Sequence, residues 1–283
     1  MAYEIECNDV TYTYPLAEKP AIKNLNIKIE KGKLYGVVGE NGSGKTTLCS
    51  ILRGFAPSFY KGEMSGEILL QGKPLDSYED QISRKIGYVF QNPFTQISGI
   101  KDTVFEEVAY GLENFGVDVK EIERKVIEIM ELTDIIELAE KSPFELSGGQ
   151  MQRVALASVI VLDPEILIID EPTSQLDPQS TESVFKIIRK LKEERKTIIL
   201  VEHKVDLLAE YSDEMIILHD SQVIKMGDSR KVLSDIGLKK YGIKLPQVTL
   251  LGEKLREAGL NIDELPITKQ QALDLIEMQR KVI

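Results

Sequence analysis

LYGVVGENGSGKTT, residues 34–47, joins an apolar strand to a glycine-rich turn and then to a run that reads as a helix as far as Arg53. Glycine tolerates backbone angles and close approaches that a Cβ atom would block, so the turn can wrap around an anionic ligand. Successive N–H groups then point inward, and the helix directs its positive end at the same place. The residues expected to contact the phosphates of a nucleotide are Gly39, Glu40, Asn41, Gly42, Ser43, Gly44, Lys45, Thr46 and Thr47.

Two side chains of this loop carry the chemistry that a nucleotide needs. Lys45 can reach the β- and γ-phosphates, and the hydroxyl of Thr46 is placed to ligate Mg²⁺. The alternative is a glycine-rich turn with no ligand. The strand before the turn and the helix after it argue against that alternative, so we expect a nucleotide with Mg²⁺.

ILIIDE, residues 166–171, is the second informative stretch. Its continuous apolar run is typical of a parallel strand that is buried on both faces. Asp170 and Glu171 stand at the carboxyl end of this strand, where open α/β sheets bind ligands. We expect Asp170 to hold Mg²⁺ through water, and Glu171 to orient the attacking water or accept its proton. The alternative, a solvated turn, is weak once the phosphate loop is present.

LSGGQ, residues 146–150, precedes a helical stretch over residues 151–161. A serine and two glycines before a helix expose N–H donors at its positive end, which predicts a second anion site. This site would consist of Ser147, Gly148, Gly149 and Gln150. An ordinary serine N-cap is the local alternative. One chain cannot easily close both anion sites on the same γ-phosphate.

The three stretches, in this order, resemble the ATP-binding cassette (ABC) family of ATPases, and the resemblance covers essentially the whole chain. It implies an α/β fold of the P-loop NTPase type, an ABC cassette with a parallel core sheet, an antiparallel β subdomain and a helical subdomain. It also implies ATP and Mg²⁺ as cofactors. In this family two cassettes pair head to tail, so that the 146–150 turn of one covers the ATP held by the other.

The resemblance also assigns roles to single residues near the expected strands. Gln91, after the strand over residues 86–90, resembles the glutamine that contacts Mg²⁺ and the attacking water. His203, after the strand over residues 197–201, matches the histidine that hydrogen-bonds the γ-phosphate. The chain has only two histidines, and we interpret the other, His219, as structural or on the surface.

Two further positions carry weaker expectations. Tyr14 resembles the aromatic residue that stacks on adenine, with Tyr12 as a possible substitute and a core tyrosine as the alternative. Asp177, in the segment SQLD over residues 174–177, stands where the family contacts the partner cassette. The family usually has a small residue in place of Gln175, which leaves the consequence for coupling between the two sites open.

The pattern along the chain predicts its organisation. Two alternating runs over residues 3–29 indicate an antiparallel β subdomain at the edge. Helical patterns over 102–114 and 119–132 indicate a helical subdomain at about 92–160, and capping residues begin both patterns. We therefore expect an ABC ATPase domain over residues 1–240 and a short helical C-terminal extension over residues 241–283, which would serve dimerisation.

Composition sets limits on location and partners. The net charge of −11 argues against binding to nucleic acid and against adsorption to anionic lipid. The longest apolar stretch, residues 154–162, is far shorter than the roughly 20 residues that span a bilayer. We see no leader, and expect a protein at the cytoplasmic face of the membrane, attached through protein contacts. Cys7 and Cys49 do not suggest a disulfide framework, and Cys49 would be a packed thiol.

Three segments indicate a branch of the family: QNPFTQ at 91–96, TVFEEVAYG at 103–111 and LPQV at 245–248. They resemble the energy-coupling factor (ECF) ATPases, although Phe94 and Thr95 replace an acidic pair common in that branch. The resemblance implies importers of vitamins or transition-metal ions. It implies as partners a second ATPase subunit, a transmembrane coupling protein and a small membrane substrate-binding protein.

Other functions remain as alternatives to an ECF motor. Another ABC importer would share every cassette motif. A chromosome-maintenance ATPase would need a long coiled coil between residues 47 and 146, and a translation ATPase would normally carry two cassettes. A binding-only module would have lost a catalytic motif, and none is lost. The transported solute, and the choice between homodimer and heterodimer, are not encoded in these motifs.

Overall fold

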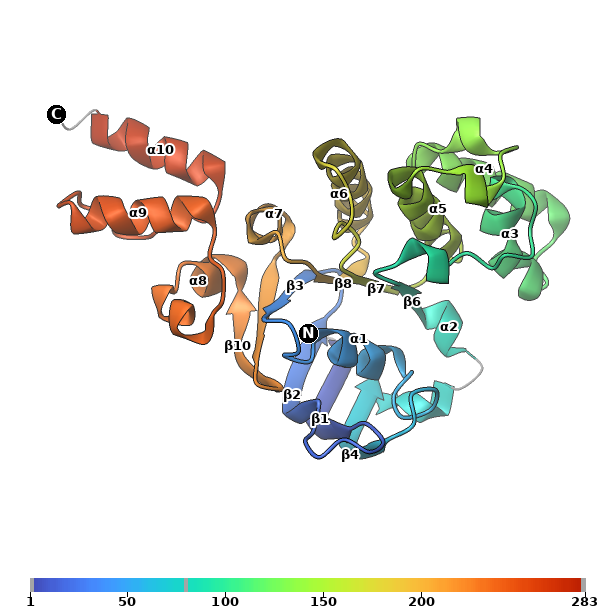
Figure 1. Cartoon of the computed structure of the whole chain (residues 1–283), viewed down its shortest axis with the longest axis horizontal. Helices are drawn as coiled ribbons and strands as arrows, with labels where there is room; N and C mark the ends of the chain where they lie inside the picture. The colour runs from blue at the N-terminus through green and yellow to red at the C-terminus, as the bar shows by residue number, and fades with distance from the viewer. Residues whose placement is uncertain (1–2, 79–80, 281–283) are drawn as a thin grey trace.

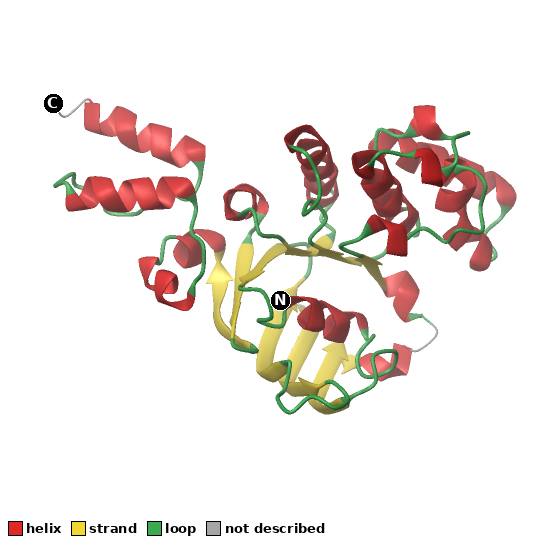
Figure 2. Cartoon of the chain, viewed as in Figure 1, coloured by secondary structure: helices red, strands yellow, loops and turns green. Residues whose placement is uncertain are grey.

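The computed structural model describes residues 3–78 and 81–280. It contains two β-sheets, a group of helices at one side and two C-terminal helices at the other (Figures 1 and 2). The strands are β1 (Tyr3–Thr13), β2 (Ile22–Glu30), β3 (Leu34–Gly39), β4 (Glu63–Leu70), β5 (Lys73–Pro74), β6 (Ile86–Val89), β7 (Ile166–Asp170), β8 (Thr197–Val201), β9 (Glu214–His219) and β10 (Gln222–Asp228). The α-helices are α1 (Lys45–Arg53), α2 (Ile82–Lys85), α3 (Val104–Asn114), α4 (Val119–Leu132), α5 (Gly148–Ile160), α6 (Pro178–Glu193), α7 (Val205–Tyr211), α8 (Ser229–Leu233), α9 (Gln247–Glu257) and α10 (Lys269–Arg280).

The core sheet has the strand order β10-β9-β3-β8-β7-β6. Its strands are parallel except for β10, which pairs antiparallel with β9 at the edge. Every residue of β3, β6, β7 and β8 is buried, as the continuous apolar runs predict. The β9–β10 hairpin is not among the strands that the sequence predicts, because the core strands are predicted only where a strand ends at a motif.

Alternate residues of the core strands pack into different hydrophobic clusters. Ile166 and Ile168 belong to a cluster that includes α1 and strands of the second sheet. Leu167 and Ile169 belong to a cluster that includes α6 and α7. The core sheet is therefore covered on both faces, and the carboxyl ends of its strands are left to meet a ligand.

The second sheet is the expected antiparallel subdomain, with the order β2-β1-β4-β5. Its central strand β1 pairs antiparallel with both β2 and β4, so that Cys7 lies opposite Ile27 on one side and Ile68 on the other. Helix α1 lies between this sheet and the core sheet (Figure 1). Both cysteines are buried free thiols, and burial raises the pKa of Cys7 to about 12.

Helices α3, α4 and α5 form a helical subdomain with its own hydrophobic cluster, which draws residues from 97 to 161. Thr103 caps α3 in a capping box with Glu106, and Asp118 caps α4. Both helices therefore begin where the sequence predicts. Figure 1 shows this group beyond β6, at the opposite side of the molecule from α9 and α10.

The C-terminal segment is partly integrated into the cassette. Ile243, Leu245 and Ile267 belong to the cluster that packs on the core sheet. Leu251 on α9 and Leu273 on α10 remain exposed. Among the residues that the structure describes, no helix is long and apolar enough to cross a lipid bilayer.

Candidate active site

The glycine-rich loop connects β3 to α1, and its three glycines are needed for different reasons. Gly42 and Gly44 have φ values of +80° and +103°, which lie in the left-handed region. A Cβ atom on Gly39 would lie 2.5 Å from the carbonyl oxygen of Leu218, and one on Gly44 would lie 2.6 Å from that of Ala21. Backbone conformation therefore requires glycine at 42, space requires it at 39, and both require it at 44.

The start of α1 is available to an anion. The helix has no side-chain cap and no acidic residue in its first turn, so its first N–H groups are free for a ligand. The buried Lys45 side chain donates from Nζ to the carbonyl oxygens of Gly39 and Glu40, at 3.0 and 3.1 Å. The ammonium group is thus held above the loop, where a phosphate would take the place of these neutral acceptors.

Asp170 lies at the end of β7 and is only 2% exposed. Its Oδ2 accepts a hydrogen bond from the hydroxyl of Tyr88 at 3.1 Å, while Oδ1 is buried and has no hydrogen-bond partner in the described residues. Burial raises the pKa of Asp170, and the hydroxyls of Thr46 and Tyr88 act in the opposite direction. A buried carboxylate oxygen without a donor, beside a threonine hydroxyl, fits the water-mediated Mg²⁺ ligand that the sequence predicts.

Glu171 is held between the two other expected catalytic residues. The Gln91 amide donates from Nε2 to Glu171 Oε2 at 2.8 Å, and His203 Nε2 lies 2.8 Å from Glu171 Oε1. The backbone of Glu171 has a φ of +47°, which is uncommon for a residue with a side chain and is found at functional sites. The ends of β6, β7 and β8 thus bring one glutamine, one glutamate and one histidine together.

These groups surround one cavity of about 410 Å³, within the range of small-molecule sites. It is lined by Ala21, Asn41, Gly42, Gly44, Lys45, Thr46, Thr47, Gln91, Glu171 and His203. The structure therefore places the phosphate loop and the three expected catalytic side chains around the same space.

The structure distinguishes the two tyrosines proposed for adenine. Tyr12 is fully buried, and its hydroxyl lies within hydrogen-bond distance of the carbonyl oxygens of Tyr60 and Lys61. Tyr14 is partly exposed, and its hydroxyl is 3.2 Å from that of Thr47 in the phosphate loop. Of the two, Tyr14 is the one whose hydroxyl lies beside the phosphate loop, so the adenine role stays a prediction for Tyr14.

The residues expected to form a second anion site lie elsewhere in the same chain, since none of them lines the cavity. Ser147 caps α5 in a capping box with Gln150, so the local alternative of a serine N-cap also holds. A Cβ atom on Gly149 would collide with the Ser180 side chain, whereas Gly148 faces open space. Asp177 caps α6 by accepting from the N–H groups of Gln179 and Ser180.

Sequence reasoning missed Tyr88 as a site residue. The only sign of Tyr88 in the sequence is a polar hydroxyl on an otherwise apolar strand. In the structure, burial raises the pKa of the Tyr88 hydroxyl above its ordinary value. The ring of His219 packs against Tyr241, with centroids 5.1 Å apart, and it does not line the cavity.

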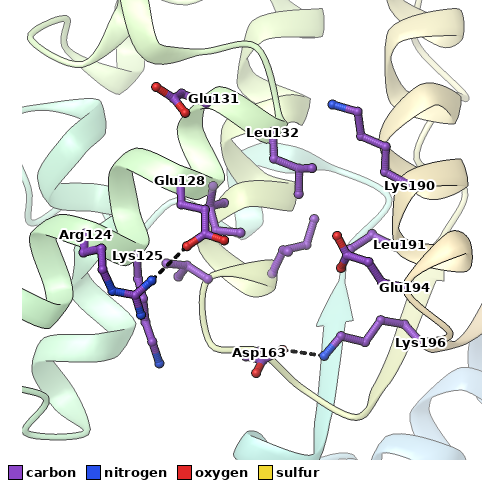
Figure 3. Close-up of a pocket in the computed structure, with 13 residues that line it drawn as sticks. Arg124, Lys125, Glu128, Glu131, Leu132, Asp163, Lys190, Leu191, Glu194 and Lys196 are labelled. Carbon is purple, nitrogen blue, oxygen red and sulfur yellow. Dashed lines mark hydrogen bonds and ion pairs between the residues drawn. The ribbon is translucent and has the colours of Figure 1, made fainter.

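A hollow of about 490 Å³ lies between α4, the turn after α5, and α6 (Figure 3). Four of its charged side chains form two pairs: Arg124 Nη1 lies 3.1 Å from Glu128 Oε2, and Lys196 pairs with Asp163. It contains no residue of the three motifs, so it is not the nucleotide site.

Comparisons with known proteins indicate the family to which the chain belongs. The profile of the ABC transporter family matches residues 22–174. An energy-coupling factor transporter ATP-binding protein of Streptococcus sanguinis is 34% identical over 277 residues, which cover 96% of this chain and 99% of that protein.

The chain belongs to the ABC transporter family of ATP-binding proteins.

Solved structures support the fold. The cbiO1 protein of Clostridium perfringens, part of an ABC transporter complex, superposes with a TM-score of 0.75 at 31% identity, over 89% of this chain and all of that one. The cassette MJ0796, in a dimer bound to ADP and phosphate, superposes with a TM-score of 0.69 at 28% identity, over 80% and 99% of the two chains. The expected ABC cassette fold is confirmed, and the chain is an ABC ATPase of the energy-coupling factor branch.

Proposed function

We propose that this ATPase binds ATP with Mg²⁺ in the cavity between the glycine-rich loop and His203, and that Glu171 activates the water that attacks the γ-phosphate. One observation carries the proposal: Glu171 is held by Gln91 and His203 at the wall of the cavity that the glycine-rich loop also lines.

The chain's own residues account for the catalytic steps. Lys45 would exchange its two carbonyl acceptors for phosphate oxygens, which form stronger charge-assisted hydrogen bonds. Gln91 and His203 already touch both oxygens of Glu171, so these two side chains control whether the carboxylate is free to accept a proton. His203 would turn from Glu171 to the γ-phosphate when ATP binds, which releases Glu171 for the attacking water.

The donor set also fits a magnesium ion. Thr46, Gln91 and Asp170 would hold it directly or through water, and all of these groups offer oxygen ligands. Bound Mg²⁺ would neutralise charge on the β- and γ-phosphates.

Two copies, or two related chains, would complete each site. The 146–150 turn does not line the cavity of its own chain, and the related cassette MJ0796 is dimeric with ADP and phosphate. We propose that the turn of one chain covers the ATP held by the other. The exposed apolar residues of α9 and α10, Leu251, Leu273 and Ile276, would add to this contact.

The membrane partners would dock beside Gln91. Phe94 and Ile100, in the segment after it, are exposed, and the ring of the preceding Phe90 stacks on Phe55 with centroids 6.2 Å apart. A helix of a transmembrane coupling protein that binds this apolar surface would move Gln91 and therefore Glu171. We propose uptake of a vitamin or a transition-metal ion, with the chain bound peripherally at the cytoplasmic face.

Purification of Glu171→Gln with ATP from native membranes in mild detergent tests this assignment. The variant is expected to trap the closed assembly, because it binds ATP without hydrolysing it. Mass spectrometry should then identify a multi-spanning coupling protein and a small membrane protein. Recovery from the soluble fraction with ribosomal or DNA-associated proteins would contradict the transport function.

A further inference from the structure

A buried carboxylate that the catalytic steps leave unused lies next to His203. Glu202 follows β8 and is only 1% exposed. Its Oε1 accepts hydrogen bonds from the backbone N–H groups of His203 and Lys204, at 2.8 and 3.2 Å. The side chain therefore holds the backbone immediately after β8.

The other oxygen of Glu202 reaches the segment that follows Glu171. Its Oε2 accepts a hydrogen bond of 2.5 Å from the hydroxyl of Thr173, which has no exposed surface. Lys204 adds a second link between the same two segments, because its Nζ donates to the carbonyl oxygen of Thr173 at 3.2 Å. The same Nζ also donates to the hydroxyl of Thr181 at 2.8 Å.

The hydrogen bonds of Glu202 and Lys204 to Thr173 join two segments that are about thirty residues apart in sequence. One leaves β7 and carries Glu171; the other leaves β8 and carries His203. The His203 side chain is 42% exposed, so little packing holds its ring, and the ring contacts Glu171 at 2.8 Å. The hydrogen bonds from the backbone at residues 203 and 204 to Glu202 hold the chain from which that ring extends. A buried carboxylate is costly unless donors surround it, and here three donors converge on one.

We propose that Glu202 is a positioning residue for ATP hydrolysis, which fixes the backbone of His203 relative to Glu171 through its bond to Thr173. This inference rests on the proposed roles of His203 and Glu171. A displacement of about 1 Å at a catalytic group can reduce turnover about a hundredfold. Loss of the anchor should therefore lower kcat while the glycine-rich loop continues to bind ATP.

Two substitutions at Thr173 test the connection without removing a buried charge. Thr173→Val keeps the shape and deletes the hydroxyl, and Thr173→Ser keeps the hydroxyl. In the full-length protein, with ATP affinity and hydrolysis measured on the same samples, we expect Thr173→Val to lower kcat at least about tenfold and to change ATP affinity by less than about threefold. Thr173→Ser should restore most of the activity. Glu210→Ala, an exposed acid on α7, is the matched control and should resemble the wild type.

Histidine NMR gives a second measurement that does not depend on turnover. The chain has two histidines, so selective ¹³C labelling gives two signals, which His203→Ala assigns. In Glu202→Ala we expect the His203 signal to shift and to lose its response to a non-hydrolysable ATP analogue with Mg²⁺. His219 should keep its position, because it lies on β9 and β3 separates that strand from β8.

The outcomes separate this inference from the proposed function. If His203→Ala abolishes hydrolysis while Thr173→Val and Glu202→Ala keep wild-type kcat and an unshifted His203 signal, the role of Glu202 is wrong and that of His203 stands. If His203→Ala hydrolyses ATP normally, the proposed role of His203 fails, and that of Glu202 fails with it. A loss of stability with unchanged kcat would show that the anchor is only structural.

Discussion

Tyr88→Phe removes one hydroxyl from the wall of the site and leaves the ring in place. That hydroxyl donates to Oδ2 of Asp170 at 3.1 Å, and the other oxygen of Asp170 already has no partner in the described part of the chain. Loss of a donor to a buried acceptor costs about 1–3 kcal/mol. Each kcal/mol corresponds to roughly 2–4 °C in Tm for a protein of 150–250 residues.

The destabilisation should depend on pH in a defined direction. Burial raises the pKa of Asp170, and the Tyr88 hydrogen bond opposes that increase. A carboxyl with a raised pKa in the folded state favours folding below its unfolded pKa, and that contribution is lost as the pH rises through the folded value. Because Tyr88 stabilises the ionised form, the Tm difference between Tyr88→Phe and wild type should grow as the pH rises through the folded pKa of Asp170, and should shrink below it.

Thermal unfolding followed by circular dichroism is a suitable assay, since the chain contains no tryptophan. Tyr78→Phe is the control, because its hydroxyl donates to the carbonyl oxygen of Leu70 at the same distance of 3.1 Å, away from the site. That variant should lose stability without the added pH dependence. The reasoning is refuted if Tyr88→Phe and Tyr78→Phe show the same Tm loss at every pH.

Three further changes test the nucleotide site. Lys45→Ala should weaken ATP binding by about tenfold or more in a titration with a fluorescent ATP analogue, since hydrogen bonds to charged groups contribute about 1.5–3 kcal/mol; unchanged affinity would exclude phosphate contact. Gly44→Ala should destabilise the fold by more than the roughly 1–2 kcal/mol expected from left-handed strain alone, because its Cβ meets the Ala21 carbonyl oxygen. Gly72 has φ +78° and open space where a Cβ atom would lie, so Gly72→Ala is the control and should show only that strain in denaturant unfolding. Equal losses of stability in Gly44→Ala and Gly72→Ala would contradict the steric argument. Tyr14→Ala should lower the affinity for ATP more than that for inorganic triphosphate, and equal losses for both ligands would argue against adenine stacking.

The sequence predicts the cassette well where a local pattern and a ligand coincide. β3, the glycine-rich turn and α1 are predicted together because phosphate binding needs all three in succession. β7 is predicted for a similar reason, since an apolar strand buried on both faces with two acids at its carboxyl end, Asp170 and Glu171, is typical of a ligand site in an α/β sheet. Helices α3 and α4 are predicted through Thr103 and Asp118, which satisfy free N–H groups at their first turns.

Other features depend on contacts between distant segments and leave no local pattern. The bonds from Gln91 and His203 to Glu171 join residues 80 and 32 positions apart, so a motif can indicate each residue but not the contact. Glu202 reads as one more polar residue after a strand until Thr173 is placed beside it. The exposed faces of α9 and α10 follow an amphipathic pattern, but the sequence does not say whether the cassette or a second chain covers them.

The central claim is that Glu171 activates water for ATP hydrolysis in this cavity. ATP binding and hydrolysis should therefore be measured on the same samples of wild type and Glu171→Gln, in native membranes that retain the partner proteins, with Glu210→Gln as the control. A general base contributes about 10²–10⁴-fold, so the account predicts near-normal ATP binding with hydrolysis at least about a hundredfold slower. Near-normal hydrolysis by Glu171→Gln would contradict the account.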